Sequence, residues 1–311
     1  MSLNKLNEKC FSIIIPAYNE ANYIYETLNR IYSLIPCNIN FEVIVVDNCS
    51  VDGTGDIVQS FNCEYFLMDK VSNPSSVRNF GASKASGSVF IFLDADILIT
   101  KKWVDELFLN LPALLTGAPL LTGSQCDISE KPNWLEKYWF AQLVTAESKY
   151  INGSNIIIHS KNFEILDGFD SDLNTSEDVD FSDRANRNGM EVINNPGYLV
   201  HHEGYPKTLT KFIRREIWHG SSDFKSIKRF LSSKTAMAGS LLLLLLFVNI
   251  LAILLTLPLI ATLLALAIIL YCMFIVFMKF GLVSMRVFSV NTFICFFYLL
   301  GRGLSPINNY L

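Results

Sequence analysis

The sequence predicts an α/β domain, in which helices cover a sheet, followed by an apolar helical tail. Three observations support this prediction. The run Val89–Leu93 is short and rich in Phe, Ile and Val, as in a strand buried on both faces of a helix-covered sheet. Residues 12–46 contain two such runs separated by helical spacing, which is typical of a βαβ unit. Residues 235–278 hold no charge over 44 positions, whereas one membrane-spanning helix needs about 20.

Net charge divides the chain into three parts. Residues 1–206 carry −13, residues 207–234 carry +6 and residues 235–311 carry +3, within an overall −4. We therefore predict an α/β domain over 1–206, a basic amphipathic juxtamembrane segment over 207–234 and a membrane domain over 235–311. The basic segment interleaves Lys and Arg with aromatic residues, which suits a bilayer interface with anionic lipid; a solvated helix packed on the domain is the alternative.

The tail predicts helices at about 235–257, 259–278 and a shorter one at 287–303. The third could span the bilayer, re-enter it or lie in its interface, and we favour a span. Lys234 and Lys279 flank the first two and place both ends in the cytosol by the positive-inside tendency. We expect no secretory signal, because charged residues precede only a very short apolar run, Phe11–Ile15. The sequence thus predicts an integral protein of the plasma membrane with its α/β domain in the cytosol.

The elements of the α/β domain follow from apolar runs and capping residues. Strands are predicted at 12–15 (ending at Pro16), 41–46, about 63–67, 89–93, about 120–124, 153–158, 192–193 and 198–202. Helices are predicted over 24–35, from the cap Asn73 to 85, after the cap Thr100, over 134–142, from the cap Ser160 to 166 and from 177 to Gly189.

Two carboxylates, Asp94 and Asp96, end the strand 89–93. Ligands of open α/β sheets lie beyond the carboxyl ends of the strands. Two acids there can hold a hard divalent cation, Mg²⁺ or Mn²⁺, which also binds substrate phosphates. Asp is equally common in solvated turns, so Asp-x-Asp alone leaves both interpretations open.

The chain resembles the family 2 glycosyltransferases, which have the GT-A fold, over about residues 11–220. The resemblance lies in six segments that occur in order: Ser12–Glu20, Val45–Thr54, Arg78–Gly81 with Ala85 and Gly87, Phe92–Asp96, Gly168–Asp170 and Glu177–Asp180. It implies a Rossmann-like mixed sheet covered by helices. It also implies an inverting transfer from a nucleotide-diphosphate sugar to an acceptor hydroxyl.

By this resemblance, the nucleotide sugar is contacted by residues after the first two strands and on the helix that follows the third. These are Pro16, Tyr18, Glu20, Asp47 and Arg78, together with Asp94. Tyr18 could pack on the base or ribose, and Asp47 could accept a hydrogen bond from the base. Arg78 suits phosphate oxygens. A surface tyrosine, a capping aspartate and an exposed helix arginine are the structural alternatives. The family often has a second Asp where Asn48 stands, and we assign Asn48 no role.

The resemblance also implies a metal site and a general base. Asp94, Asp96 and His202 are the expected metal ligands; His201 and His202 point to opposite faces of a strand, so one at most reaches the metal, and a structural histidine is the alternative. Asp178 is the expected base, with Glu177 beside it, and the two could exchange roles. Favourable acidic charge at a helix N-terminus is the alternative for this pair.

Arg214, Arg215 and Trp218 resemble a membrane-proximal region that could hold an acceptor lipid or diphosphate. The fuller Gln-x-x-Arg-Trp pattern of processive relatives is absent, so a processive synthase is not expected. The predicted acceptor is a lipid-linked or cell-envelope glycan at the membrane, and no nucleic-acid partner is expected. Two rivals remain: a nucleotidyl- or phosphosugar-transferase of similar fold, and a non-catalytic membrane scaffold that binds nucleotide sugars.

Overall fold

The computed structural model describes residues 9–144, 150–173 and 175–306. By its internal contacts the chain forms two units, Met1–Glu130 with Ala146–Gly204, and Lys131–Thr145 with Tyr205–Leu311. The first holds the sheet and the second holds the apolar helices. Each is described by itself.

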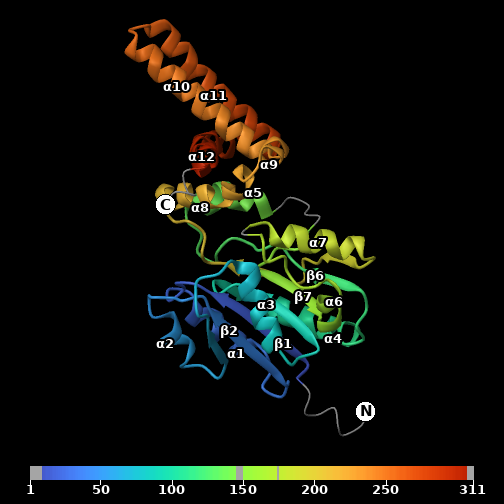
Figure 1. Cartoon of the computed structure of the whole chain (residues 1–311). Coiled ribbons are helices and arrows are strands. Elements are labelled where there is room, and N and C mark those ends of the chain that lie inside the picture. The colour runs from blue at the N-terminus through green and yellow to red at the C-terminus, as the bar shows by residue number, and fades with distance from the viewer. Residues whose placement is uncertain (1–8, 145–149, 174, 307–311) are drawn as a thin grey trace. The chain divides into compact units, whose positions relative to one another are not determined.

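In the described part of the chain, the first unit has a seven-stranded mixed sheet in the order β3-β2-β1-β4-β7-β6-β8 (Figure 1). The strands are β1 (Phe11–Ala17), β2 (Phe41–Asp47), β3 (Glu64–Leu67), β4 (Val89–Leu93), β6 (Leu120–Gly123), β7 (Asn155–His159) and β8 (Glu191–Asn194). Strands β3, β2, β1 and β4 run parallel, and β7 is antiparallel to both of its neighbours. The carboxyl ends of the parallel strands therefore share one edge.

Helices cover both faces of this sheet because alternate strand residues point to opposite sides. They are α1 (Ile24–Leu34), α2 (Thr54–Val58), α3 (Pro74–Lys84), α4 (Lys101–Leu114), α6 (Ser160–Ile165) and α7 (Glu177–Arg187). Residues of α1 and α4 pack with Ile13 and Ile91 on one face. Residues of α6 and α7 pack with Ile14 and Phe92 on the other.

Two local predictions were wrong. Strand β1 continues through Pro16 to Ala17; its register with β4 ends at Ile14, so the missing N–H of proline removes no bond from that ladder. Helix α6 is capped by the His159 side chain, which accepts a hydrogen bond from the Lys161 N–H at 3.1 Å, and Ser160 is already helical.

The strand β5 (Ile97–Ile99) was missed by the sequence analysis. It pairs antiparallel with β9 (Val200–His202), which sets His202 opposite Ile97. This two-stranded sheet follows directly on Asp96 and determines what lies next to it.

The second unit contains a π-helix (Glu136–Phe140) that runs into α5 (Ala141–Val144), then α8 (Leu209–Gly220), a 3-10 turn (Ser221–Phe224) and α9 (Ile227–Ser232). Three longer helices follow: α10 (Lys234–Leu254), α11 (Pro258–Phe280) and α12 (Met285–Leu304). All three are long and apolar enough to cross a membrane. The proposed boundaries at 206 and 234 stay predictions, since by contacts this unit also takes in residues 131–145.

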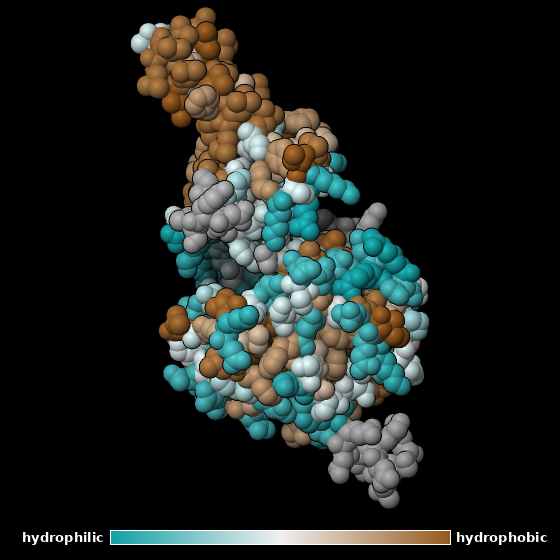
Figure 2. Space-filling model, in the orientation of Figure 1, coloured by the Kyte–Doolittle hydropathy of each residue, from teal (hydrophilic) through white to brown (hydrophobic). Residues whose placement is uncertain are grey.

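Helices α10 and α11 form a hairpin whose visible surface is almost entirely hydrophobic (Figure 2). Leu244, Phe247, Leu259 and Phe274 are among its exposed side chains. Helix α12 packs on the first turns of α10, where a Cβ added to Gly239 would lie 2.5 Å from the Gly303 nitrogen. Apolar surface of this extent is unfavourable in water and favours association with a membrane.

Candidate active site

The turn after β4 holds Asp94 and Asp96 at the edge of the sheet where the parallel strands end. Thr27 of α1 fixes this turn, because its hydroxyl donates to the Ala95 carbonyl at 2.7 Å. Both acids therefore lie where the sequence predicted a ligand site.

Asp94 is held by two side chains from elsewhere in the sheet unit. Its carboxylate accepts a hydrogen bond from Arg78 Nη2 at 2.7 Å and one from Ser154 Oγ at 2.5 Å. Burial opposes its ionisation, yet the Arg78 charge and the Ser154 hydroxyl leave the pKa of Asp94 below its usual value. Asp94 is thus an ionised, fixed carboxylate.

Asp96 lies beside His202. The Nε2 atom of His202 is 3.3 Å from Asp96 Oδ2, whereas the neighbouring His201 directs Nδ1 to the Ile128 carbonyl at 2.9 Å. The Glu203 N–H donates to the Asp96 carbonyl at 2.9 Å, and a Cβ added to Gly204 would lie only 1.8 Å from Asp96 Oδ2. The segment 202–204 therefore determines the position of Asp96. A side chain at position 204 would require the Asp96 carboxylate to move.

Glu177 and Asp178 open helix α7. Glu177 accepts a hydrogen bond from Arg78 Nη1 at 2.7 Å. The two oxygens of Asp178 accept backbone N–H groups, from Gly153 at 3.1 Å and Val179 at 2.9 Å. Burial, together with the negative charge of Glu177, raises the pKa of Asp178 to about 6. A carboxylate with a pKa near neutrality suits proton transfer.

The loops after β1 and β2 carry the predicted nucleotide contacts. Pro16 lies within β1, and Tyr18 beyond it is 51% exposed. Asp47 is 1% exposed and accepts hydrogen bonds from Tyr65 Oη and the Ser50 N–H, both at 2.8 Å. Asp47 is thus held in place by the β2–α2 turn and by β3.

Glu20 lies near the carboxylates of the β4 turn. Burial, together with the charges of Asp96, Asp94 and Asp52, raises the pKa of Glu20 to about 8. Negative potential is therefore concentrated at this edge, as a site for a cation requires.

The donor set fits a divalent cation that is shared with a phosphate ligand. In the described residues no group of three or more His, Cys, Asp or Glu side chains is arranged to hold a metal alone. Asp96 and His202 supply one oxygen and one nitrogen close together. Mg²⁺ sites of this kind use one or two carboxylates plus substrate phosphates.

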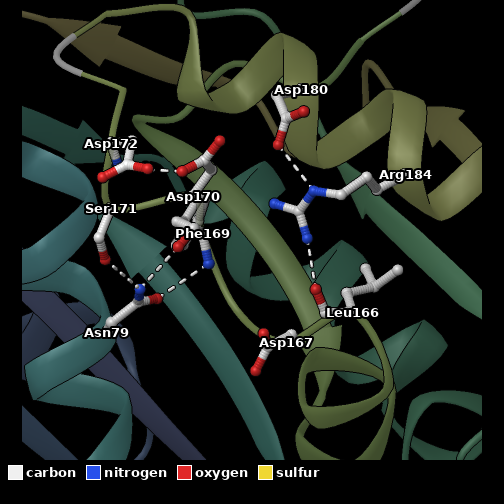
Figure 3. Close-up of a pocket in the computed structure, with 9 residues that line it drawn as sticks. All are labelled: Asn79, Leu166, Asp167, Phe169, Asp170, Ser171, Asp172, Asp180 and Arg184. Atoms are coloured by element: carbon white, nitrogen blue, oxygen red, sulfur yellow. Dashed lines mark hydrogen bonds and ion pairs between the residues drawn. The ribbon is translucent and has the colours of Figure 1, made fainter.

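Asn79, next to Arg78 on α3, holds the turn Gly168–Asp170. Its amide donates to the Phe169 carbonyl at 2.7 Å and accepts from the Phe169 N–H at 2.9 Å (Figure 3). The turn and α7 border a polar cavity of about 560 Å³, and Arg184 and Asp180, which lie one turn apart on α7, pair at its edge. Two neighbouring residues of α3 thus hold two separate stretches, 169–171 and Glu177.

Arg214, Arg215 and Trp218 lie on α8 of the second unit. Arg215 pairs with Glu216 at 2.8 Å and lies over the Phe140 ring at 5.1 Å from its centroid. Trp218 is 43% exposed. Their acceptor role stays a prediction, as do the roles assigned to the residues of the sheet unit.

Sequence reasoning missed three residues that contact the site: Ser154, Gly204 and Cys126. Burial and the charges of Asp94 and Asp96 raise the pKa of the Cys126 thiol well above its usual value, so it remains neutral beside them. The short polar sequence Gly153-Ser154 before β7 was the available signal for the first. The other two show no local pattern.

Two family models match the chain. Glycosyl transferase family 2 matches residues 12–161, and Glycosyl transferase family group 2 matches residues 127–282, which is half of the chain. The chain belongs to the family 2 glycosyltransferases. The predicted family is confirmed.

Two named glycosyltransferases align with part of the chain. Glycosyltransferase AglE of Haloferax volcanii is 35% identical over 118 residues, 36% of this chain and 38% of AglE. Poly(ribitol-phosphate) β-N-acetylglucosaminyltransferase TarS of Staphylococcus aureus is 37% identical over 103 residues, 31% of this chain and 18% of TarS. The chain therefore spans well under two thirds of the length of these relatives.

The fold is shared more widely than the sequence. Mannosyltransferase PcManGT of Pyrobaculum calidifontis, solved with GDP-Man and Mn²⁺, matches with a TM-score of 0.57 over 97% of this chain and 88% of that chain, at 18% identity. The predicted GT-A fold followed by apolar helices is confirmed.

Proposed function

We propose that this family 2 member is a membrane-associated, inverting glycosyltransferase. It moves a sugar from a nucleotide-diphosphate sugar to a hydroxyl of a lipid-linked or cell-envelope glycan acceptor. The observation that carries this proposal is the placement of two acidic sites on one buried arginine. Asp94 at the end of β4 and Glu177 at the start of α7 both pair with Arg78 at 2.7 Å.

The donor occupies the edge formed by the carboxyl ends of β1, β2 and β4. Asp47, whose oxygens accept from Tyr65 and Ser50, would offer a further lone pair to the base, and Tyr18 is exposed enough to pack on the base or ribose. Asp96 and His202 would hold a Mn²⁺ or Mg²⁺ ion, with Asp94 beside them. That ion supplies neutralisation of charge on the departing nucleoside diphosphate. PcManGT, which shares this fold and was solved with Mn²⁺, supports a divalent metal in general.

Asp178 removes the proton from the acceptor hydroxyl as that oxygen forms its bond to the anomeric carbon. Its pKa of about 6 leaves it ionised at neutral pH and able to accept a proton. Glu177 Oε1 pairs with Arg78 Nη1 at 2.7 Å, and this pairing favours Asp178 as the base.

The second unit supports the proposal of a lipid-linked acceptor. Exposed apolar residues of α10 and α11 favour a bilayer environment, and basic residues on α8 and α9 favour anionic headgroups. A catalytic domain tethered in this way would meet lipid-linked acceptors at high effective concentration. The charge flanking α10 and α11 favours a cytosolic active site at the plasma membrane.

The test is nucleoside-diphosphate release by the full chain in detergent. UDP-, GDP- and dTDP-sugars would be offered with Mn²⁺ or Mg²⁺ and a lipid extract. Metal-dependent release from one donor, with a glycosylated lipid product, is the expected result. Release of pyrophosphate instead would indicate a nucleotidyltransferase, and binding without turnover of any donor would indicate a scaffold.

A further inference from the structure

Arg78 is the most constrained charged side chain of the site. It lies on α3, is 4% exposed, and directs Nη2 to Asp94 and Nη1 to Glu177, each at 2.7 Å. Asp94 and Glu177 are 83 positions apart in sequence but meet on one guanidinium group. The planar fork of Arg fixes the relative orientation of the two carboxylates that it holds, whereas the flexible ammonium group of Lys does not.

A second link joins the same two segments. Ser154 Oγ donates to Asp94 at 2.5 Å, and the adjacent Gly153 N–H donates to Asp178 at 3.1 Å. A Cβ on Gly153 would lie 3.4 Å from Arg78 Nη2 and 3.5 Å from Glu177 Oε1. Arg78 and the 153–154 corner therefore form a closed hydrogen-bonded connection between the β4 turn and the start of α7.

We propose that Arg78 is a positioning residue that couples the donor side of the site to the base. It holds Asp94 and Glu177 in place. Because Glu177 is paired with Arg78, Asp178 is the carboxylate that receives the acceptor proton. This inference rests on the proposed function and extends it by assigning Arg78 a role other than donor binding.

The geometry differs from the diphosphate contact predicted for Arg78 from the sequence. Both terminal nitrogens already donate to carboxylates, and the side chain is almost fully buried. The remaining N–H groups of Arg78 are buried with the side chain, so a diphosphate oxygen could reach them only if the surrounding groups moved. The neighbouring Asn79 strengthens the positioning role, because it fixes the 169–171 turn from the same helix.

Neutralisation of Glu177 matters because Asp178 is adjacent to it. The charges of Glu177 on α7 and Arg78 on α3 affect the pKa of Asp178. The charge of Asp178 in turn raises the pKa values of the nearby Cys126 and Tyr150 side chains. Glu177 disfavours ionisation of Asp178, whereas Arg78 favours it. Removal of either partner should therefore move the acidic limb of the activity profile, in opposite directions.

The experiment compares Arg78→Gln, Arg78→Lys, Glu177→Gln and the double variant Arg78→Gln/Glu177→Gln with wild type, all as full chains in detergent. Donor KM, kcat and the pH dependence of kcat/KM are measured for the donor that wild type uses. For Arg78→Gln we expect kcat to fall about 100-fold from misplaced reacting groups, with a much smaller rise in donor KM from the loss of support for Asp94. The acidic limb should move to higher pH.

The other variants separate charge from geometry. Arg78→Lys keeps the charge but not the rigid geometry of the two contacts, so its kcat should be intermediate and its acidic limb close to that of wild type. In the double variant no carboxylate is left at position 177, and kcat should recover about tenfold relative to Arg78→Gln. Glu177→Gln alone is isosteric and should move the acidic limb to lower pH.

A rise in donor KM at unchanged kcat in Arg78→Gln, with no recovery in the double variant, would overturn the inference and make Arg78 a donor-binding residue. If Arg78→Gln does not fold, Glu177→Gln provides the test. An acidic limb that stays at the wild-type position in Glu177→Gln would also overturn the inference. Absence of transfer by wild type with every donor is a different result, because it overturns the proposed function itself and with it the reaction in which Arg78 would act.

Discussion

The site contains two pairs of acids that look alike in sequence and differ in structure. Asp94 with Asp96 ends a buried strand, and Glu177 with Asp178 begins a helix. One member of each pair, Asp94 or Glu177, accepts a hydrogen bond from Arg78 at 2.7 Å. The other member is placed differently: Asp96 meets His202, and Asp178 accepts backbone N–H groups.

We propose that this difference separates a fixed carboxylate, Asp94, from a reactive one, Asp178. The pKa of Asp94 lies below its usual value because Arg78 and Ser154 favour its ionised form despite burial. The pKa of Asp178 is raised to about 6 because burial and Glu177 outweigh its hydrogen bonds. We interpret the first type as scaffolding and the second as the group that exchanges a proton.

The largest effect is expected for Asp178→Asn. The amide keeps the shape of the side chain but cannot take the acceptor proton, so transfer should fall about 10²–10⁴-fold. Donor binding should persist, since Asp178 lies on the α7 side of the site. Transfer rates and donor affinity by isothermal titration would be measured on the same full-chain sample. Loss of donor affinity equal to the loss of transfer would show that Asp178 is not the base.

A smaller effect is expected for Gly204→Ala. The added methyl group would meet Asp96 Oδ2 at 1.8 Å and displace it from His202. Because this changes the support of a ligand and not the ligand itself, we expect activity at limiting Mn²⁺ to fall about 10–100-fold.

A Mn²⁺ titration of turnover is the measurement for Gly204→Ala. Excess metal should restore much of the rate, because both Asp96 and His202 are still present. An unchanged metal requirement would separate Asp96 from the metal site and break the parallel between the two acid pairs.

The raised pKa of Asp178 predicts a moderate dependence on pH. A base must be ionised, and a group with a pKa of about 6 loses its charge as the pH falls through that value. Wild-type kcat/KM should therefore be constant at neutral pH and about tenfold lower one unit below the midpoint. A profile that stays flat down to pH 5 would contradict the assignment, and a matched profile of donor binding controls for titration elsewhere.

The sequence was sufficient to locate the two acid pairs but not to show how they are connected. Asp94 and Asp96 follow a recognisable buried run, and Glu177 and Asp178 stand at a predicted helix start. The contact of Arg78 with both pairs depends on how α3 lies between β4 and α7, which no periodicity encodes. The family resemblance predicted a donor contact for Arg78, whereas in the structure it pairs with Asp94 and Glu177.

Short strands were also difficult to predict from the sequence. The run Ile97–Ile99 is three residues long and follows a turn, so alternation could not reveal β5. Without β5, strand alternation indicated that at most one of His201 and His202 could reach the metal, but it did not decide which one. The register with β9 brings His202 to Asp96, which is consistent with the histidine preferred from the sequence. The apolar tail, by contrast, was readable from composition, because membrane helices need length and low charge more than specific contacts.

The smallest effect is expected for Asp180→Asn. This variant is the sharpest control for Asp178→Asn, because both acids lie in the first turn of α7. Asp180 is a third acid in the first turn of α7, but it borders the cavity of Figure 3 and pairs with Arg184 at 2.7 Å. Such i,i+4 pairs contribute about 0.3–0.5 kcal/mol when partly exposed. Transfer should therefore stay within about twofold of wild type, with a change in thermal midpoint near the error of measurement. If Asp180→Asn lost as much activity as Asp178→Asn, acidic charge at the helix start would explain both results, and the distinction between fixed and reactive carboxylates would fail.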